Sequence, residues 1–495
     1  MLRKIRIALG LLFLAGITLL FLDFTGAAHA WLGWMAKVQF LPAVLALNVG
    51  VVVGLVALTL IFGRVYCSVI CPLGVFQDIF GHLGRLGKKQ RYRYGWSKGL
   101  TWLRASFLVV FIALLLAGFT SIAALVAPYS LYGRFTASFL TPAWIWLNNL
   151  LARVAEHYES YAFYSVDLWM RSLWALVLSG VTMAVIVVLA WRNGRTWCNT
   201  VCPVGTVLGF LSRFSLLKPV IDTDICNNCG LCARQCKAAC INSKEHSIDY
   251  SRCVACMDCI DNCRHGAISY RRPVRKAAKA SGAEGTDGGR RAFMVGAGVA
   301  ATVLAVKAQK AKVDGGMAAV TEKKAPERST PIVPPGAVSL DHLSQHCTAC
   351  QLCVSACPNG VLHPSTDPSR LMQPECSYER GYCRPECTRC GDVCPTGAIR
   401  PVSKEEKTGI QIGHAVWVRA NCVVLADGVE CGACARHCPA GAITMIPSDV
   451  RDEASPKVPM VNPEKCIGCG KCEQLCPASP FSAIYVEGHE RHREI

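Results

Sequence analysis

Acidic residues are scarce in this sequence: 34 Asp and Glu stand against 52 Lys and Arg, which leaves a formal net charge of +18. Such an excess of positive charge is common in nucleic-acid-binding proteins, but no basic face interleaved with base-stacking aromatic residues is evident. An activated nucleophile, a catalytic triad and a phosphate-binding loop are not evident either. We therefore expect no nucleic acid partner and no catalytic residue of these kinds, and the positive charge needs another explanation.

The basic residues gather in short runs beside long apolar segments. Hydrophobic residues make up 52% of the chain and are concentrated in roughly its first 200 residues. Clusters of Lys and Arg next to apolar segments mark the cytoplasmic ends of membrane helices, and they also contact anionic lipid. The runs cover residues 1–6, 84–98, 191–197 and 271–276.

Four stretches are apolar enough and long enough to cross a bilayer, for which about 20 residues suffice. When residues 1–6 are placed in the cytoplasm, each basic run falls on the cytoplasmic side, so one orientation satisfies all of them. Between the third and fourth stretches, the amphipathic segment 141–155 predicts an interfacial helix on the outer face. The four predicted spans are residues 5–24, 41–63, 101–128 and 173–191.

The chain contains 30 cysteines whose spacing does not indicate a disulfide framework, because the pattern CxxCxxCxxxC recurs. In two-cluster ferredoxins, each such run supplies three ligands to one [4Fe-4S] cluster and its fourth cysteine to the other cluster. The block 226–263 contains two runs and therefore predicts two clusters. The predicted ligand sets are Cys226, Cys229 and Cys232 with Cys263, and Cys253, Cys256 and Cys259 with Cys236.

Three residues in this block depart from the usual pattern. Lys237 and Arg264 stand where a proline usually follows the fourth cysteine. Cys240 is an additional cysteine, which either replaces Cys236 as a ligand or is a buried or free thiol.

The block 347–476 contains four further runs, and a proline follows the fourth cysteine of each. It predicts four more [4Fe-4S] clusters, or six in the whole chain. In the second run five cysteines compete for four places, and we prefer Cys383 to Cys376 because it is nearer in sequence. The predicted sets are Cys347, Cys350 and Cys353 with Cys394; Cys383, Cys387 and Cys390 with Cys357; Cys422, Cys431 and Cys434 with Cys476; and Cys466, Cys469 and Cys472 with Cys438.

A CxxxCP motif occurs twice in the apolar part of the chain, after the second and after the fourth predicted span. The first motif contains Cys67 and Cys71, and the second contains Cys198 and Cys202. The repetition suggests an internal duplication of two-span units. These four soft thiolates predict a shared redox or metal-binding site. The alternative is that they are packing thiols or a disulfide pair.

The stretch GGRRAFMVGAGVAATVLAV begins at Gly288 and contains paired arginines, Arg290 and Arg291. Its apolar part is about 15 residues long, which is short for a membrane anchor and typical of a signal sequence. An ordinary fifth membrane helix is the alternative, and both interpretations place the following domain outside. The predicted domains are 1–218 (membrane), 219–272 (two clusters), 273–289 (linker), 290–308 (signal or fifth helix), 309–340 (linker) and 341–495 (four clusters).

At these motifs the chain resembles two known families. Residues 1 to about 272, with the paired CxxxCP motifs and the two-cluster block, resemble the NapH-type membrane quinol dehydrogenase subunit of periplasmic nitrate reduction. Residues from about 288 onward, with the twin arginines and four clusters, resemble the NapG-type periplasmic ferredoxin. The resemblance implies a multi-domain membrane protein with an all-α transmembrane bundle and α+β ferredoxin-like [4Fe-4S] domains. It also implies that the twin-arginine route exports the last domain in folded form.

The resemblance further implies that the protein is the electron-transfer component of a quinol dehydrogenase in the bacterial inner membrane. The first ferredoxin domain would face the cytoplasm, and the last domain would relay electrons from the quinol pool to a periplasmic cytochrome or reductase. One alternative is a maturation or regulatory factor that handles copper through the CxxxCP motifs. Another is electron transfer from a soluble ferredoxin to quinone. His29 is a candidate for the quinone site, and a structural histidine is the alternative.

Overall fold

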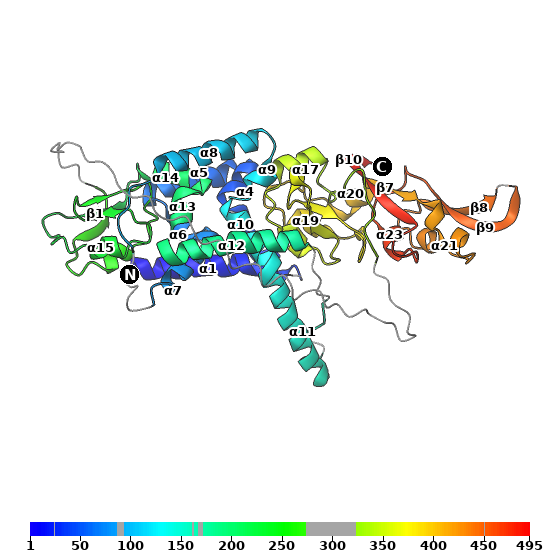
Figure 1. Ribbon diagram of the computed structural model, residues 1–495, viewed down its shortest axis with the longest axis horizontal. Helices are drawn as coiled ribbons and strands as arrows, with labels where there is room; N and C mark the ends of the chain where they lie inside the picture. Colours follow the sequence, from blue (N-terminus) through cyan, green and yellow to red (C-terminus); the bar gives the residue numbers. More distant parts are fainter. Residues whose placement is uncertain (24, 87–93, 161–162, 167–171, 274–322, 450) are drawn as a thin grey trace.

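A computed structural model describes residues 1–23, 25–86, 94–160, 163–166, 172–273, 323–449 and 451–495. A bundle of helices occupies the middle of an elongated molecule (Figure 1). A small domain of residues 218–271 lies at the end near the N-terminus, and we call it the inner domain. The larger C-terminal part, residues 323–495 without residue 450, lies at the opposite end, and we call it the outer domain. The twin-arginine segment, the first linker from residue 274 and the second linker up to residue 322 lie outside the described residues.

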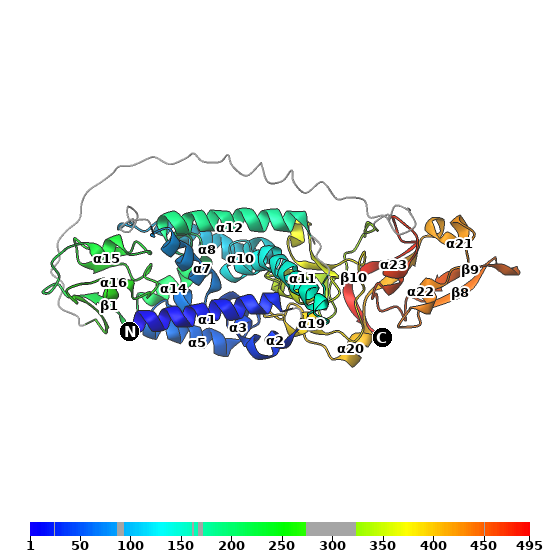
Figure 2. The same cartoon turned by 90° about the horizontal axis from the view of Figure 1, so that it is seen from below.

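Two helices among the described residues are long and apolar enough to cross a membrane: α1 (Leu2–Leu22) and α12 (Leu173–Asn193). Both run along the long axis of the molecule between the inner and outer domains (Figure 2). At 1.5 Å per residue, 21 residues give about 31 Å, close to the thickness of a bilayer's hydrocarbon core. These helices confirm the first and fourth predicted stretches as long apolar helices and indicate association with a membrane.

The second and third predicted spans do not form single long helices. The second is divided into α4 (Phe40–Leu45) and α5 (Val49–Phe62), and the third ends as α8 (Thr101–Leu116). Asn48 caps α5 by accepting a hydrogen bond from the Val51 N–H, and Leu47 before it has a left-handed backbone. Gly118 has a positive φ of 81° just after α8. Local capping therefore shortens these helices, although their hydropathy alone predicts longer ones.

Short helices complete the bundle and fill the spaces at its two ends. α11 contains the amphipathic segment and projects sideways from the bundle (Figure 1). The helical form predicted for residues 141–155 is thus confirmed. The remaining helices of this part are α2 (Ala27–Leu32), α3 (Trp34–Lys37), α6 (Val65–Val69), α7 (Pro72–Leu83), α9 (Thr120–Ala123), α10 (Pro128–Phe135), the π-helix η2 (Thr136–Leu140), α11 (Thr141–His157), α13 (Thr196–Thr200) and α14 (Pro203–Ser212).

The inner domain is built from two small antiparallel sheets and two short helices. β1 (Lys218–Ile221) pairs with β4 (Ile268–Arg271), so the two ends of the domain lie side by side. β2 (Ile241–Asn242) pairs with β3 (Ser247–Ile248). The helices α15 (Leu231–Arg234) and α16 (Asp258–Asp261) each contain the third cysteine of a run, Cys232 and Cys259.

The outer domain has the same kind of short elements, arranged around three antiparallel strand pairs. β5 (Leu362–Pro364) pairs with β6 (Pro374–Cys376), β7 (Ile410–Trp417) with β10 (Ile484–Glu494), and β8 (Ile443–Asp449) with β9 (Asp452–Val461). The helical elements are α17 (Leu340–His346), α18 (Leu352–Ala356), η4 (Pro368–Arg370), α19 (Arg389–Asp392), α20 (Lys404–Gly409), η5 (Arg419–Asn421), α21 (Val423–Ala426), α22 (Ala433–Arg436) and α23 (Lys471–Leu475).

One continuous buried core passes through all three parts of the molecule. It includes Cys236 of the inner domain, Cys67 and Tyr66 of the bundle, and Cys347 and Cys350 of the outer domain. A second core lies in the last part of the chain, between β7 and β10 on one side and β8 and β9 on the other. The first core therefore places cysteines of the three parts in one packed unit.

Candidate metal centres

The first predicted ligand set of the inner domain surrounds a single pocket. Cys226, Cys229, Cys232 and Cys263 all line it. Glycine and residues with left-handed backbones shape the tight loop: Asn228 and Gly230 have φ values of 61° and 68°. Such a loop brings three thiols two residues apart to one side of the pocket, while the fourth thiol comes from a later segment. This arrangement fits one [4Fe-4S] cluster.

The second inner set is also brought together, and Cys240 is part of it. Cys259 interacts electrostatically with Cys253, Cys256 and Cys236. The Sγ atoms of Cys236 and Cys240 are 3.5 Å apart, and Cys240 also interacts with Cys253. Five thiols therefore gather where four ligands are expected, so the choice between Cys236 and Cys240 stays open.

In the outer domain, the set nearest the bundle gathers cysteines of two runs. Cys353 interacts electrostatically with Cys347, Cys350 and Cys394, which come from two different runs. The Ala349 N–H donates to Cys347 Sγ at 3.4 Å, and the Ile399 N–H donates to Cys394 Sγ at 3.5 Å. Amide donors of this kind stabilise thiolates and raise the potential of a cluster bound to them.

The next pocket is lined by Cys357, Cys383, Cys387 and Cys390, and also by Cys376. Cys376 lies at the end of β6 and is buried. Both candidates for the first ligand of this run, Cys376 and Cys383, therefore line the pocket. The buried Lys407 donates through Nζ to the backbone oxygens of Arg384 and Cys387. Burial alone lowers the pKa of Lys407, but the adjacent Cys383 thiol more than offsets this, and the pKa is raised. The sequence pattern did not single out this cation.

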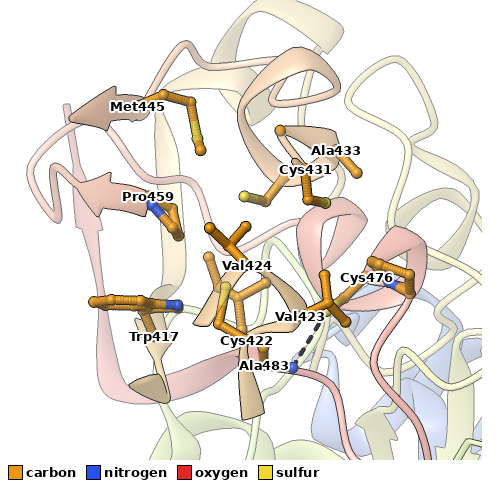
Figure 3. Close-up of a pocket in the computed structure, with 14 residues that line it drawn as sticks. Trp417, Cys422, Val423, Val424, Cys431, Ala433, Met445, Pro459, Cys476 and Ala483 are labelled. Atoms are coloured by element: carbon orange, nitrogen blue, oxygen red, sulfur yellow. Dashed lines mark hydrogen bonds between the residues drawn. The ribbon is translucent and has the colours of Figure 1, made fainter. Parts of the chain in front are cut away.

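The last two sets surround two further pockets. Cys422, Cys431, Cys434 and Cys476 line one of them, closed on one side by Trp417, Met445 and Pro459 (Figure 3). The Ala483 N–H donates to Cys476 Sγ at 3.2 Å, which Figure 3 draws as a dashed line. Cys438, Cys466, Cys469 and Cys472 line the other pocket.

Sets of four thiols around apolar pockets, with amide donors directed at sulfur, fit [4Fe-4S] clusters as the bound groups. Within the described ranges, no group of three or more His, Cys, Asp or Glu side chains is placed to hold a single metal ion. The predicted sets are therefore brought together by the fold, and their role as cluster ligands stays a prediction.

The two CxxxCP motifs also meet. Cys67 lies in α6 and Cys198 in α13, while Cys71 and Cys202 are the residues that cap α7 and α14. All four are buried free thiols, so the structure contains no disulfide between them. Cys202 interacts electrostatically with Cys67, Cys71 and Cys198. Burial raises the pKa of the Cys71 and Cys202 thiols, so they are neutral at pH 7 unless a cation or metal stabilises the thiolates.

A buried ion network joins the inner domain to the bundle. Asp78 of α7 accepts from Arg6 at 2.7 Å, from Arg195 at 2.7 Å and from Lys237 at 2.9 Å. Lys237 also pairs with Asp258, and its backbone oxygen accepts from the Arg195 N–H at 2.8 Å. This explains why a lysine follows Cys236 in place of the usual proline.

His29 lies in α2, at the end of the bundle that meets the outer domain. The Asp23 carboxylate accepts a hydrogen bond from its backbone N–H at 3.1 Å. Burial lowers the pKa of the imidazole, and Asp23, Lys37 and Asp392 are its charged neighbours. A quinone-binding role for His29 stays a prediction.

Four segments of the chain match known families of iron–sulfur domains. Residues 44–91 and 175–221, each with one CxxxCP motif, match a 4Fe-4S binding domain. Residues 246–269 match another 4Fe-4S binding domain, and residues 429–479 match a 4Fe-4S dicluster domain. No solved structure matches the chain.

Several curated proteins are similar to parts of the chain. The methylamine utilization ferredoxin-type protein MauM of Methylophilus methylotrophus is 32% identical over 169 residues, which are 32% of this chain and 73% of MauM. The ferredoxin-type protein NapF of Escherichia coli (strain K12) is 28% identical over 185 residues, 36% of this chain and 99% of NapF. YccM of the same strain, named for electron transport, is 25% identical over 228 residues, 45% of this chain and 55% of YccM.

Proposed function

From the premise that this chain belongs to the ferredoxin-type [4Fe-4S] proteins, we propose that it carries electrons across a membrane. In this proposal it takes electrons from quinol, or from a membrane partner that oxidises quinol. It passes them to a cytochrome or reductase in the periplasm. Bound clusters supply one-electron transfer, and the chain holds, separates and insulates them.

The observation that carries this proposal is the position of the cysteine sets at opposite ends of a helix bundle with an apolar exterior. Leu12 and Leu19 on α1, and Val181 and Val188 on α12, expose about half of their surfaces. Inside the same bundle, Arg64 and Arg195 are almost completely buried. Apolar residues outside and charged residues inside are what a lipid environment requires.

The charge distribution supports the proposed orientation. Arg3 and Arg6 at the start of α1 contact Asp258 and Asp78 at the inner end, and the basic segment 191–197 reaches the same end. Because Lys and Arg are retained on the cytoplasmic side, the inner domain is expected in the cytoplasm and the outer domain in the periplasm.

The orientation is tested by labelling single introduced cysteines with a membrane-impermeant thiol reagent in spheroplasts. Lys244 in the inner domain and Glu453 in the outer domain are both exposed, so Lys244→Cys and Glu453→Cys form a matched pair. We expect Glu453→Cys to be labelled in intact spheroplasts and Lys244→Cys only after lysis, each relative to the unsubstituted chain. Equal labelling of both variants before lysis would exclude the proposed route.

The cofactor content is tested separately. Six clusters require about 24 iron atoms and as many sulfides per chain, four of each per cluster. Anaerobically purified protein should reach this content, and quinol added to it in membranes should reduce the outer clusters. A content of two clusters or fewer, or outer clusters that quinol never reduces, would contradict the proposal.

A further inference from the structure

Three of the largest fully buried side chains in the described residues are arginines: Arg64, Arg134 and Arg195. Two of them occupy the same place in the duplicated motif. The first copy reads GRVYCSVICPLG from Gly63, and the second reads GRTWCNTVCPVG from Gly194. The repeated unit thus contains an arginine three residues before each CxxxCP, as well as the cysteines.

The arginines are exchanged between the two copies. Arg195 of the second copy donates from Nη1 to the backbone oxygen of Cys67 at 2.6 Å. Arg64 of the first copy donates from Nη2 to the backbone oxygen of Cys198 at 3.3 Å. Each guanidinium therefore fixes the first cysteine of the other copy, and the contacts follow an approximate two-fold relationship.

The glycine at the end of each copy makes this exchange sterically feasible. A Cβ atom at Gly74 would collide with the Cys67 oxygen and would lie 2.8 Å from Arg195 Nη1. A Cβ atom at Gly205 would collide with the Cys198 oxygen and would lie 2.9 Å from Arg64 Nη2. The same position in both copies must therefore lack a side chain.

The charges at the site do not balance with the protein groups alone. Arg195 pairs with Asp78 at 2.7 Å, but Asp78 also pairs with Arg6 and Lys237, so three cations share one carboxylate. Arg64 donates to Asn199 Oδ1 and to the Ser251 backbone oxygen, and it forms no ion pair with a carboxylate in the described part of the chain. Its Nε has no hydrogen-bond partner there. A buried cation needs an anion nearby, and the sulfur of Cys67 lies 3.8 Å from Arg64 Nη2.

Backbone amides are directed at the sulfur atoms of the capping cysteines. The Gly205 N–H donates to Cys202 Sγ at 3.3 Å at the start of α14, and Cys71 has the equivalent interaction with Gly74 at the start of α7. Thiolates are stabilised at helix N-termini and beside guanidinium groups. The amide donor is present in both copies of the motif, and in the first copy Arg64 Nη2 also lies 3.8 Å from Cys67 Sγ.

The site lies between the cysteine sets of the two end domains. On the inner side, Arg64 contacts Ser251 and interacts with Cys253 of the second inner set. On the outer side, Tyr66 interacts with Cys67, Cys71 and Cys202. Tyr129 in turn interacts with Tyr66 and with Cys350 and Cys394 of the nearest outer set. All three regions belong to one packed core.

We propose that Cys67, Cys71, Cys198 and Cys202 together bind a seventh, thiolate-held iron–sulfur centre, whose negative charge is neutralised by the exchanged Arg64 and Arg195. The inference rests on the proposed function, because it gives the electrons their passage through the bundle. One electron is accepted from a reduced centre at one end and donated to an oxidised centre at the other. No bond is formed or broken, and no proton is required.

The first test counts iron. The full-length double variant Cys67→Ser/Cys198→Ser should lose the iron and sulfide of one centre relative to the unsubstituted chain, along with one component of the Mössbauer spectrum. Ser68→Ala, a buried change in the same helix as Cys67, is the control and should retain them. Unchanged iron in the double variant would overturn the proposal, and so would copper in place of iron in the unsubstituted chain.

The second test separates the arginine's charge from its structural role. Arg104 donates to the same Ser251 backbone oxygen at 3.2 Å, and none of its hydrogen bonds goes to a cysteine. In Arg64→Gln, the equilibrium constant for reducing the bundle centre should fall about tenfold, which is 59 mV in midpoint potential. Arg64→Lys should recover part of this shift, and Arg104→Gln should leave the potential unchanged.

Equal potentials in Arg64→Gln and Arg104→Gln would overturn the role of Arg64. The readouts also separate this inference from the proposed function. If the six end-domain clusters are present and quinol still reduces the outer ones in Cys67→Ser/Cys198→Ser, the electrons do not pass through the bundle centre, and this inference fails while transmembrane electron transfer stands. If quinol reduces none of the clusters in the unsubstituted chain, the proposed function fails whatever the iron content of the bundle.

Discussion

The bundle contacts an iron–sulfur domain at each end, and the two contacts use different chemistry. At the inner end, Asp78 and Asp258 are surrounded by Arg3, Arg6, Arg195 and Lys237 in a buried ion network. At the outer end, hydroxyl groups of α9 donate to backbone oxygens: Thr120 donates to Ser344 and Cys347, and Ser121 to Ser369. The inner contact therefore contains a buried ion network, whereas the outer contact has no ion pair among the described residues, although Arg389 donates to the Thr25 backbone oxygen at 2.8 Å.

This difference indicates how each end should respond to its surroundings. Buried ion pairs depend on every partner, because removing one leaves the others without compensation in a medium of low dielectric. Neutral hydrogen bonds to backbone oxygens contribute less individually, and their loss is local.

Asp78→Asn should be the most damaging of these changes. It removes the negative charge that Arg6, Arg195 and Lys237 share, and it leaves three buried cations facing one another. Breaking a buried pair in this way costs about 3–5 kcal/mol. Hydrogen exchange of the full-length protein in detergent should show faster exchange in residues 218–271, with α17 and α18 unchanged. Equal loosening at both ends would show that the network stabilises the whole bundle instead.

Acid should loosen the outer domain before the inner one. Burial, together with the neighbouring His489, lowers the pKa of His492 from an ordinary 6.5 to about 4. The neutral form is favoured in the folded state, so this stability is complete above pH 6.5 and is lost as the pH falls toward about 4. Over 2.5 pH units the loss is about 3 kcal/mol. The three cations lower the pKa of Asp78 below 3.8, so the inner network persists throughout this range.

Hydrogen exchange at pH 7 and at pH 5 tests this order, because His492 is on β10, which packs against α17 beside the bundle. We expect β10 and α17 to lose protection at pH 5 while β1 and β4 keep theirs. His492→Phe fills the same site without a titrating group and should remove the difference. If β1 and β4 lost protection before β10 and α17, the prediction that acid loosens the outer domain first would be wrong.

Restoring the usual proline at residue 237 should release the inner domain without affecting its clusters. Lys237→Pro removes the cation that joins Asp78 to Asp258, at a cost of about 2 kcal/mol, typical of hydrogen bonds to charged groups. Arg264→Pro is the matched control, because Arg264 follows the fourth cysteine of the other run and is exposed. Limited proteolysis should cut residues 218–271 away from the bundle faster in Lys237→Pro only, with the iron content equal in both variants.

The cysteine sets could be predicted from the sequence because iron–sulfur ligation imposes a fixed spacing on a local loop. Four of the six predicted sets line a common pocket with all four cysteines, including the fourth cysteine that comes from the partner run. The spacing could not decide whether Cys240 and Cys376 are ligands, since tertiary folding brings each of them to a cysteine set. The ion network of Asp78 could not be predicted either, because its partners lie far away along the chain.

The importance of the two arginines in the CxxxCP copies could have been predicted from the sequence. Each stands three residues before the first cysteine and directly after a glycine, so comparing the two copies would have identified Arg64 and Arg195. Helix lengths were less predictable. Hydropathy alone does not register the capping by Asn48 or the positive φ of Gly118, which divide the second span and end the third.

Arg134 should affect the potential of the outer centre nearest the bundle. It is almost completely buried in α10, donates from Nη2 to the Leu125 backbone oxygen at 3.2 Å, and interacts electrostatically with Cys350. Arg134→Gln removes a positive charge beside an anionic site, so reduction becomes about tenfold less favourable, or 59 mV. The reduction potential in Arg134→Lys should lie between those of the unsubstituted chain and of Arg134→Gln. A redox titration followed by electron paramagnetic resonance measures this, and inner-domain potentials should not move.

The smallest expected effect is at the outer contact itself. Thr120→Val keeps the shape of the side chain but removes the donor to the Ser344 and Cys347 backbone oxygens. Gln373 loses one of its two acceptors and keeps the Ser344 oxygen. The cost should be about 1 kcal/mol, because the hydrogen bonds are neutral and the oxygens lie at a domain boundary. Hydrogen exchange should therefore rise modestly in α17 alone, and Ser121→Ala, which removes one longer hydrogen bond, should do less. If Thr120→Val instead released the outer domain as completely as Asp78→Asn releases the inner one, neutral contacts would be the dominant attachment, and the distinction between the two ends would be lost.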